Sequence, residues 1–395
     1  MNRHLLLLAL CQGLFLTNNV TFIAINGLVG LSLAPAGWMA TLPITAYVLG
    51  SAMAAMPVAW MQAHWGRRRS FQAGLLVAML ACAMAALAVW WRSFGLLLAA
   101  TVTGGFYSAN AALYRFAGPE LVEPVHKERA ISLVLAGGII GGVFGPKLAS
   151  WTRGALELPF LGAYLALIGV AALALIVVSC VRFPTHVAPL KGADIGRPVL
   201  ELARQPIFVI AVAAAALGYG VMNLLMAATP IAMQQCGLPF ENTALVLEWH
   251  VLGMYVPSFF TGHLIKRVGV LPVMSAGVLL NLVCVAVALS GVELTQFLVA
   301  LFTLGVGWNF LYIGGTTLLT DTYRPEEKTR AQGAMDTCVF ATMMVSSFAS
   351  GALITTRGWT LLNLGSLLPL ALIALALVWL ARQRPLRPAP GASRP

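Results

Sequence analysis

The chain has 395 residues, of which 59% are hydrophobic and 9% charged, and its mean hydropathy is +0.87. Soluble domains carry roughly 25% charged residues, so this composition excludes a soluble catalytic domain and predicts an all-α, polytopic membrane protein. The formal net charge of +11 comes mainly from Lys and Arg residues in the connections between apolar segments. We therefore expect membrane lipid as a partner and no nucleic acid.

Apolar runs of about 18 or more residues, long enough to cross a hydrocarbon core of about 30 Å, recur along the whole chain. The first begins at Leu5 and lacks a small-residue cleavage site, so we expect a retained helix rather than a signal peptide. The cysteines form no CxxC pair, which argues against a disulfide framework or a zinc site. We predict twelve transmembrane helices, at 4–32, 38–61, 70–91, 94–116, 130–151, 158–181, 206–235, 242–266, 270–290, 294–321, 330–354 and 358–381.

The longest connection between these spans contains several prolines and glycines and divides the chain into two halves of six spans. We predict an N-terminal half at 1–181, a cytoplasmic linker at 182–205 and a C-terminal half at 206–381. Residues 382–395, rich in Pro and Arg, are predicted to form a disordered tail.

An internal repeat supports this division. The turn at Gly66 and Arg67 recurs about 203 positions later around Arg267 and Gly269, and the sequence KERA at 127–130 recurs as KTRA at 328–331. Two copies of one helical unit around a central path, with the ligand near the midplane, are typical of alternating-access transporters.

Basic residues are distributed unevenly between the two predicted membrane faces. With both termini inside, all but four of the 24 Lys and Arg residues fall in cytoplasmic segments; the four are Arg92, Lys147, Arg153 and Arg357. The positive-inside rule therefore predicts a multi-pass protein of a bacterial inner membrane with both termini in the cytoplasm.

The turn between the second and third spans resembles the major facilitator superfamily. That family carries G-x-x-x-D-R-x-G-R-R there, and the stretch 59–68 keeps Gly66, Arg67 and Arg68, with Ala63 at the acidic position and His64 at the first arginine. The C-terminal copy keeps Gly262, Arg267 and Gly269, with Lys266 at the acidic position. The resemblance implies the major facilitator fold of twelve helices over nearly the whole chain.

Two residue pairs indicate a substrate. Met222 and Met226 are four residues apart in the seventh span, and His250 and Met254 have the same spacing in the eighth. Residues four apart share a helix face, and thioether sulfur with imidazole suits Cu(I). Because the two helices are antiparallel, we predict that the four side chains meet near the middle of the membrane.

The competing interpretation is packing, because methionine is an ordinary filler of apolar gaps. Either pair alone can arise by chance in a chain with 15 methionines. Of the six histidines, however, only His250 lies deep inside an apolar span, where a polar group needs a partner or a function. Both pairs at matched depth on successive helices favour a metal site.

The same four residues resemble the CcoA-like copper importers, a bacterial branch of the superfamily with Met-x-x-x-Met in the seventh span and His-x-x-x-Met in the eighth. The resemblance implies copper import for copper-enzyme assembly, with copper as transported substrate and no cofactor. It also implies candidate partners: a periplasmic copper carrier or cytochrome oxidase assembly factors. The branch includes proteins labelled riboflavin transporters, so a vitamin substrate stays open.

Three further residues are candidates for roles in metal entry or in coupling. Met233 continues the Met226 helix face and is a candidate first ligand on the path inward. Glu248 lies about 200° around the helix from His250 and is a candidate coupling carboxylate, as is Asp336 in the eleventh span. Arg115 is predicted at the cytoplasmic end of span four rather than inside the membrane, which disfavours proton-linked antiport.

We therefore predict a copper importer that is not an enzyme, with metal ligands Met222, Met226, His250 and Met254. The alternative is a transporter of a small organic solute such as riboflavin or a drug, and an aromatic-rich interior would favour it. A membrane scaffold or sensor is disfavoured because no sizeable extramembrane domain is predicted.

Overall fold

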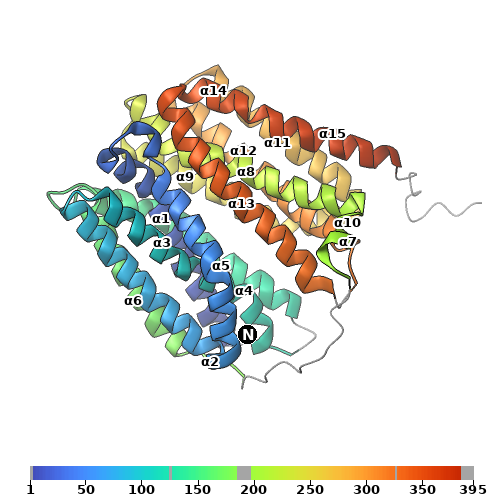
Figure 1. Cartoon of the computed structure of the whole chain (residues 1–395), viewed down its shortest axis with the longest axis horizontal. Coiled ribbons are helices and arrows are strands. Elements are labelled where there is room, and N and C mark those ends of the chain that lie inside the picture. The colour runs from blue at the N-terminus through green and yellow to red at the C-terminus, as the bar shows by residue number, and fades with distance from the viewer. Residues whose placement is uncertain (1–2, 124–126, 185–196, 325–326, 384–395) are drawn as a thin grey trace, which may run out of the picture.

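The computed structural model describes residues 3–123, 127–184, 197–324 and 327–383, and these residues form helices and turns without a β-strand (Figure 1). The first half contains α1 (Arg3–Leu33), η1 (Gly37–Met39), α2 (Leu42–Trp90), α3 (Phe94–Ala111), α4 (Tyr114–Ala117), η2 (Gly118–Leu121), α5 (Lys127–Arg153) and α6 (Leu161–Ser179). The second half contains α7 (Val199–Leu202), α8 (Pro206–Gln235), α9 (Phe240–Tyr255), α10 (Ser258–Val268), α11 (Val270–Ser290), α12 (Leu294–Leu319), α13 (Lys328–Thr356), α14 (Gly358–Gly365) and α15 (Leu367–Gln383).

Successive long segments run antiparallel, so the bundle has two ends. We call the end where α1 begins and α15 finishes the terminal end, and the opposite end, with the turns at 34–41, 154–160 and 236–239, the loop end. In Figure 1 the first half, coloured blue to green, and the second half, coloured yellow-green to red, lie against each other as two bundles. Half of the predicted linker (185–196) and most of the predicted tail (384–395) lie outside the described residues.

Eleven segments of the described chain are long and apolar enough to cross a membrane. The predicted eighth span is not among them, because it is divided into α9 and α10 at Val256 and Pro257. Proline has no backbone N–H and cannot continue the helical hydrogen bonding. With α9 and α10 as one interrupted crossing, the predicted all-α architecture of twelve helices is confirmed. The predicted continuity was wrong for this span and for the last one, which is divided into α14 and α15 at Ser366.

The predicted turn between spans two and three is a kink inside α2. Gly66 has φ 75° and ψ 169° there, and Gly269, at the equivalent place between α10 and α11, has φ 95° and ψ 161°. This backbone region is almost restricted to glycine. The sequence repeat therefore corresponds to a repeated backbone conformation.

Three buried apolar clusters organise the core. The largest joins the two halves and contains Phe22 and Ile25 of α1 together with Leu225 and Ile231 of α8. The other two lie within single halves, one around the start of α1 and the other around α8, α12 and α15 near the terminal end. Apolar packing thus unites the halves toward the loop end.

Polar and aromatic contacts reinforce this closure. The hydroxyl of Thr41 donates to the carbonyl oxygen of Ser347 at 2.6 Å and accepts from the N–H of Gly351 at 2.9 Å. The Arg153 guanidinium lies over the Phe240 ring at 5.1 Å, and the Phe160 and Phe240 rings meet edge to face at 5.4 Å. The structure is therefore closed at the loop end.

At the terminal end, the last part of the predicted linker is held against the C-terminal half. Arg197 donates from Nε and Nη2 to the buried carboxylate of Glu327, at 2.7 and 2.8 Å. Glu327 directly precedes α13 and lies outside its apolar span, which begins at Arg330. These bonds and the backbone N–H of Arg324 hold the pKa of the Glu327 carboxyl well below its usual range.

Candidate functional site

Helix α12 is the structural centre of the candidate site. It packs along both α8 and α9, whereas α8 and α9 contact each other over only a short stretch. Gly253 of α9 and Gly305 of α12 make the crossing close: an added Cβ would lie 2.6 Å from the Phe302 carbonyl oxygen and 2.5 Å from the His250 carbonyl oxygen, respectively. Glycine is therefore required at this helix crossing.

His250 is fully buried beside this crossing. Its Nδ1 lies 2.7 Å from the carbonyl oxygen of Leu301 on α12. Because a carbonyl only accepts hydrogen bonds, Nδ1 carries the proton, and the lone pair of the neutral ring is on Nε2. Within the described part of the chain, Nε2 is buried and has no hydrogen-bond partner. A histidine that ligates a metal usually has this arrangement, with its other nitrogen donating to a carbonyl.

The three methionines of the predicted site are buried as well. Met222, Met226 and Met254 expose at most 9% of their surface and belong to the same apolar cluster, together with the fully buried Met233. Met222 follows Gly218, which faces Leu311 of α12, by one helical turn. All four predicted ligands thus lie on helices that pack on α12. The burial of the three methionines in an apolar cluster also fits the interpretation that they fill space in the core.

The two candidate coupling carboxylates lie apart from His250. Glu248 points to α5, where its Oε1 is 3.4 Å from Nζ of Lys147. Asp336 is half-buried on α13, within electrostatic reach of Arg115 from the other half. Glu248 therefore belongs to the contact between halves, and Asp336 belongs to a separate polar group nearer the terminal end.

Asn309 stabilises the interruption of the eighth span. Its Nδ2 donates to the carbonyl oxygen of Met254 and to Oγ of Ser258, both at 2.7 Å, and its Oδ1 accepts from the Thr261 hydroxyl at 2.7 Å. In an unbroken helix the Met254 carbonyl would bond to the backbone N–H four residues later. A side chain of α12 thus provides the hydrogen bonds that the proline break disturbs.

An aromatic cluster lies beside these residues, formed by Tyr219 of α8, Tyr255 of α9, and Trp308 and Tyr312 of α12. The Trp308 and Tyr312 rings are stacked with centroids 5.2 Å apart and 9° between their planes. Tyr219 meets both edge-on, at 5.2 and 5.6 Å, and Tyr255 lies 6.3 Å from Trp308. Trp308 is 6% exposed, and its Nε1 has no hydrogen-bond partner among the described residues.

Sequence reasoning missed this cluster and the role of Asn309. The spacing of Trp308 and Tyr312 by four residues places them on one face of α12, and Tyr219 precedes Met222 by three residues on α8. These spacings were a usable signal for a flat aromatic surface in the C-terminal half. Nothing in the sequence indicated that Asn309 meets the proline break.

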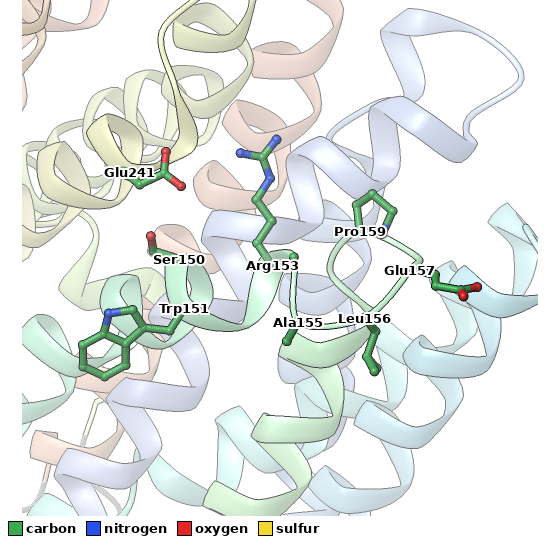
Figure 2. A pocket seen from close by; sticks show the side chains of 9 residues that line it. Ser150, Trp151, Arg153, Ala155, Leu156, Glu157, Pro159 and Glu241 are labelled. Atoms are coloured by element: carbon green, nitrogen blue, oxygen red, sulfur yellow. The ribbon is translucent and has the colours of Figure 1, made fainter.

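A surface cavity of about 500 Å³ opens at the loop end of the seam between the halves (Figure 2). Ser150, Trp151 and Arg153 line it from the end of α5, and Glu241 lines it from the start of α9. In Figure 2 the Arg153 and Glu241 side chains face the same space from opposite halves. The cavity lies outside the closed seam and is distinct from the aromatic cluster and from His250.

The fold and the buried polar and aromatic groups between its helices define a multi-pass membrane transporter rather than an enzyme. The family model of the Major Facilitator Superfamily matches residues 5–256 and 214–395, which together cover nearly the entire chain. The chain belongs to the Major Facilitator Superfamily and is a secondary transporter.

Relatives and solved structures agree with this assignment. The chain is 37% identical over 363 residues to the riboflavin transporter RfnT of Brucella anthropi, covering 91% of each chain. A mutant of the nucleoside transporter NupG has a TM-score of 0.73 at 14% identity, covering 95% of this chain and 99% of that one. An inward-facing bacterial homologue of the lysosomal transporter Spinster has a TM-score of 0.72 at 14% identity, covering 98% of both chains. These two structures support the fold alone.

Proposed function

We propose that the chain transports a planar aromatic solute of the flavin class by alternating access. The observation that carries this proposal is the aromatic cluster with its stacked pair, Trp308 and Tyr312. Aromatic rings bind flat heterocycles by stacking, and the buried unpaired Nε1 of Trp308 offers a hydrogen bond to an acceptor on the ligand. The 37% identical relative is named as a riboflavin transporter, which supports the same substrate class.

Uptake of radiolabelled riboflavin tests the proposal. In cells that cannot synthesise riboflavin, expression of the chain is expected to restore uptake, and Trp308→Leu is expected to reduce affinity about ten-fold by removing the stacking surface. Trp90→Leu is the matched control, because Trp90 is 64% exposed at the end of α2. Absence of uptake by a correctly inserted wild-type protein would overturn the flavin proposal.

A second candidate substrate is copper, favoured by the orientation of His250. The ring donates from Nδ1 to a carbonyl and leaves a buried lone pair on Nε2, as a metal ligand requires. Met222, Met226 and Met254 supply soft sulfur on the adjoining helix surfaces. In this proposal copper passes from Met226 and His250 to Met222 and Met254, and Met233 is an earlier ligand on the path.

Radioactive copper uptake separates the two candidates. Met226→Leu and His250→Leu preserve bulk while removing ligands, so copper uptake is expected to fall with either variant if these side chains bind the metal. The control Met53→Leu changes an exposed methionine of α2. Copper uptake unchanged by Met226→Leu and His250→Leu would reject the metal proposal, whatever the result for riboflavin.

We further propose that the terminal end faces the cytoplasm of a bacterial inner membrane. The support is the concentration of Lys and Arg in the segments at that end. The loop-end cavity then opens toward the periplasm. A periplasmic carrier and oxidase assembly factors remain proposed partners only under the copper alternative.

A further inference from the structure

Two buried donors near the aromatic cluster have no protein acceptor. Among the described residues, neither Nε1 of Trp308 nor Nε of Arg115 has a hydrogen-bond partner. An unpaired buried donor destabilises the fold, and such groups in folded proteins call for a specific explanation. Neither donor takes part in the contacts that close the loop end.

Arg115 reaches the cluster from the opposite half. It lies in α4, with its guanidinium 4.7 Å from the centre of the Phe116 ring. Tyr255 packs against the buried cluster of the N-terminal half that contains Tyr114, the residue before Arg115. The Arg115 side chain also lies within hydrogen-bonding reach of the Tyr312 hydroxyl. The guanidinium therefore lies beside the aromatic surface, so that rings from one half and a cation from the other meet here.

The ligand chemistry follows from these groups. A ring stacked on the cluster would present its rim to Arg115 and to the Trp308 N–H, and both groups only donate hydrogen bonds. A rim that carries carbonyl oxygens satisfies them, and a guanidinium binds such oxygens strongly and with defined geometry. A purely hydrocarbon ring would leave both donors unpaired.

We propose that Arg115 is a substrate-binding and specificity-determining residue that completes the solute site from the N-terminal half. This inference rests on the proposed flavin function. Arg115 pairs with the carbonyl-bearing edge of the isoalloxazine ring, which contains an imide, while the aromatic cluster binds the face. Asp336, within electrostatic reach of Arg115, offsets part of the charge of Arg115 when no solute is bound.

Equilibrium binding to the purified full-length protein in lipid nanodiscs tests the assignment, with quenching of flavin fluorescence as the readout. The probes are riboflavin and N3-methylriboflavin, whose methyl group blocks the imide edge and leaves the ring face intact. Wild type is expected to bind riboflavin about ten-fold more tightly than the methylated analogue. Arg115→Met is expected to weaken riboflavin binding about ten-fold and to abolish this preference.

Control variants make each outcome decisive. Arg68→Met removes an exposed arginine of α2 and is expected to leave both affinities unchanged. Arg115→Lys keeps the charge but lacks the planar guanidinium, so it is expected to bind riboflavin and to lose most of the preference for riboflavin over the methylated analogue. If Arg115→Met does not fold, the result for Arg115→Lys tests the role of the guanidinium. Retention of both affinity and preference without the guanidinium would overturn the role of Arg115. Absence of any flavin binding to wild type would overturn the proposed function itself.

Discussion

Lys147 and Glu248 form an ion pair between the two halves, with Nζ of Lys147 on α5 lying 3.4 Å from Oε1 of Glu248 on α9. The sequence alone places Lys147 among the four basic residues outside the predicted cytoplasmic segments and makes Glu248 a candidate for coupling. Their pairing instead places both residues in the contact that closes the loop end. It also explains why Glu248 and His250 point to different neighbours, α5 and α12.

Glu248→Gln is expected to shift the transporter toward opening at the loop end. A partly exposed ion pair contributes less than about 1 kcal/mol, so the open population is expected to rise about two- to five-fold. The measurement is maleimide labelling of Ser347→Cys in a background with Cys180, Cys236 and Cys338 replaced by serine. Ser347 is buried at this seam, and only its carbonyl bonds to Thr41. The charge-swapped double variant Lys147→Glu/Glu248→Lys is expected to restore slow labelling, and unaltered labelling of the single variant would refute the gating role.

Gly66→Ala and Gly269→Ala are expected to destabilise the protein by about 1–3 kcal/mol each, because both positions have the glycine-specific backbone conformation. Thermal unfolding in detergent measures the effect. Gly333→Ala is the control, since this helical glycine has open space where the Cβ would lie and alanine favours helices. Equal unfolding temperatures for all three variants would contradict the requirement for glycine at the two turns.

Asn309→Leu is expected to cost about 1–3 kcal/mol, because it removes both the donor to the Met254 carbonyl and the acceptor for the Thr261 hydroxyl. Thermal unfolding and transport are both measured. Asn363→Leu is a comparison, because its amide donates within a single helix turn to the Trp359 carbonyl. If transport and stability of Asn309→Leu matched wild type, the bridging role would be rejected.

Glu327→Gln is expected to destabilise the protein at neutral pH but not under strongly acidic conditions. The folded-state pKa of Glu327 is depressed by Arg197, so its stabilisation is present above the unfolded pKa, near 4.5, and is lost as pH falls toward the folded value. Unfolding temperatures of wild type and variant should therefore differ by a constant amount from pH 7 to about 5, and the difference should shrink progressively as the pH falls below about 4. The exposed Glu123→Gln is the control, and a pH-independent difference for Glu327→Gln would contradict this assignment.

Hydrophobic run length was sufficient to predict the all-helical architecture, because each span must satisfy its own backbone hydrogen bonds in lipid. The Gly66 and Gly269 turns were also predictable, since a repeated motif marks both. Pro257 in the sequence signals a possible interruption of the helix. The interruption is stabilised, however, by a hydrogen bond from Asn309, which is 52 positions away from Pro257. Such a compensation arises only when α9 and α12 are packed together.

The candidate site was only partly predictable, because some of its contacts form only when distant helices pack together. Helical spacing correctly indicated that Glu248 and His250 face different ways. It did not reveal that Arg115, at the end of span four, faces tyrosines of the opposite half, because contacts between halves have no local sequence signal.

The amide of Asn309 bonds the interruption of the eighth span to α12, and a carbonyl oxygen of α12 also accepts the hydrogen bond of His250. An interruption that is bonded to the helix carrying the proposed binding groups is expected to move together with that helix. Bending at Val256 and Pro257 would then swing α10 at the terminal end while the aromatic surface of α12 keeps its shape.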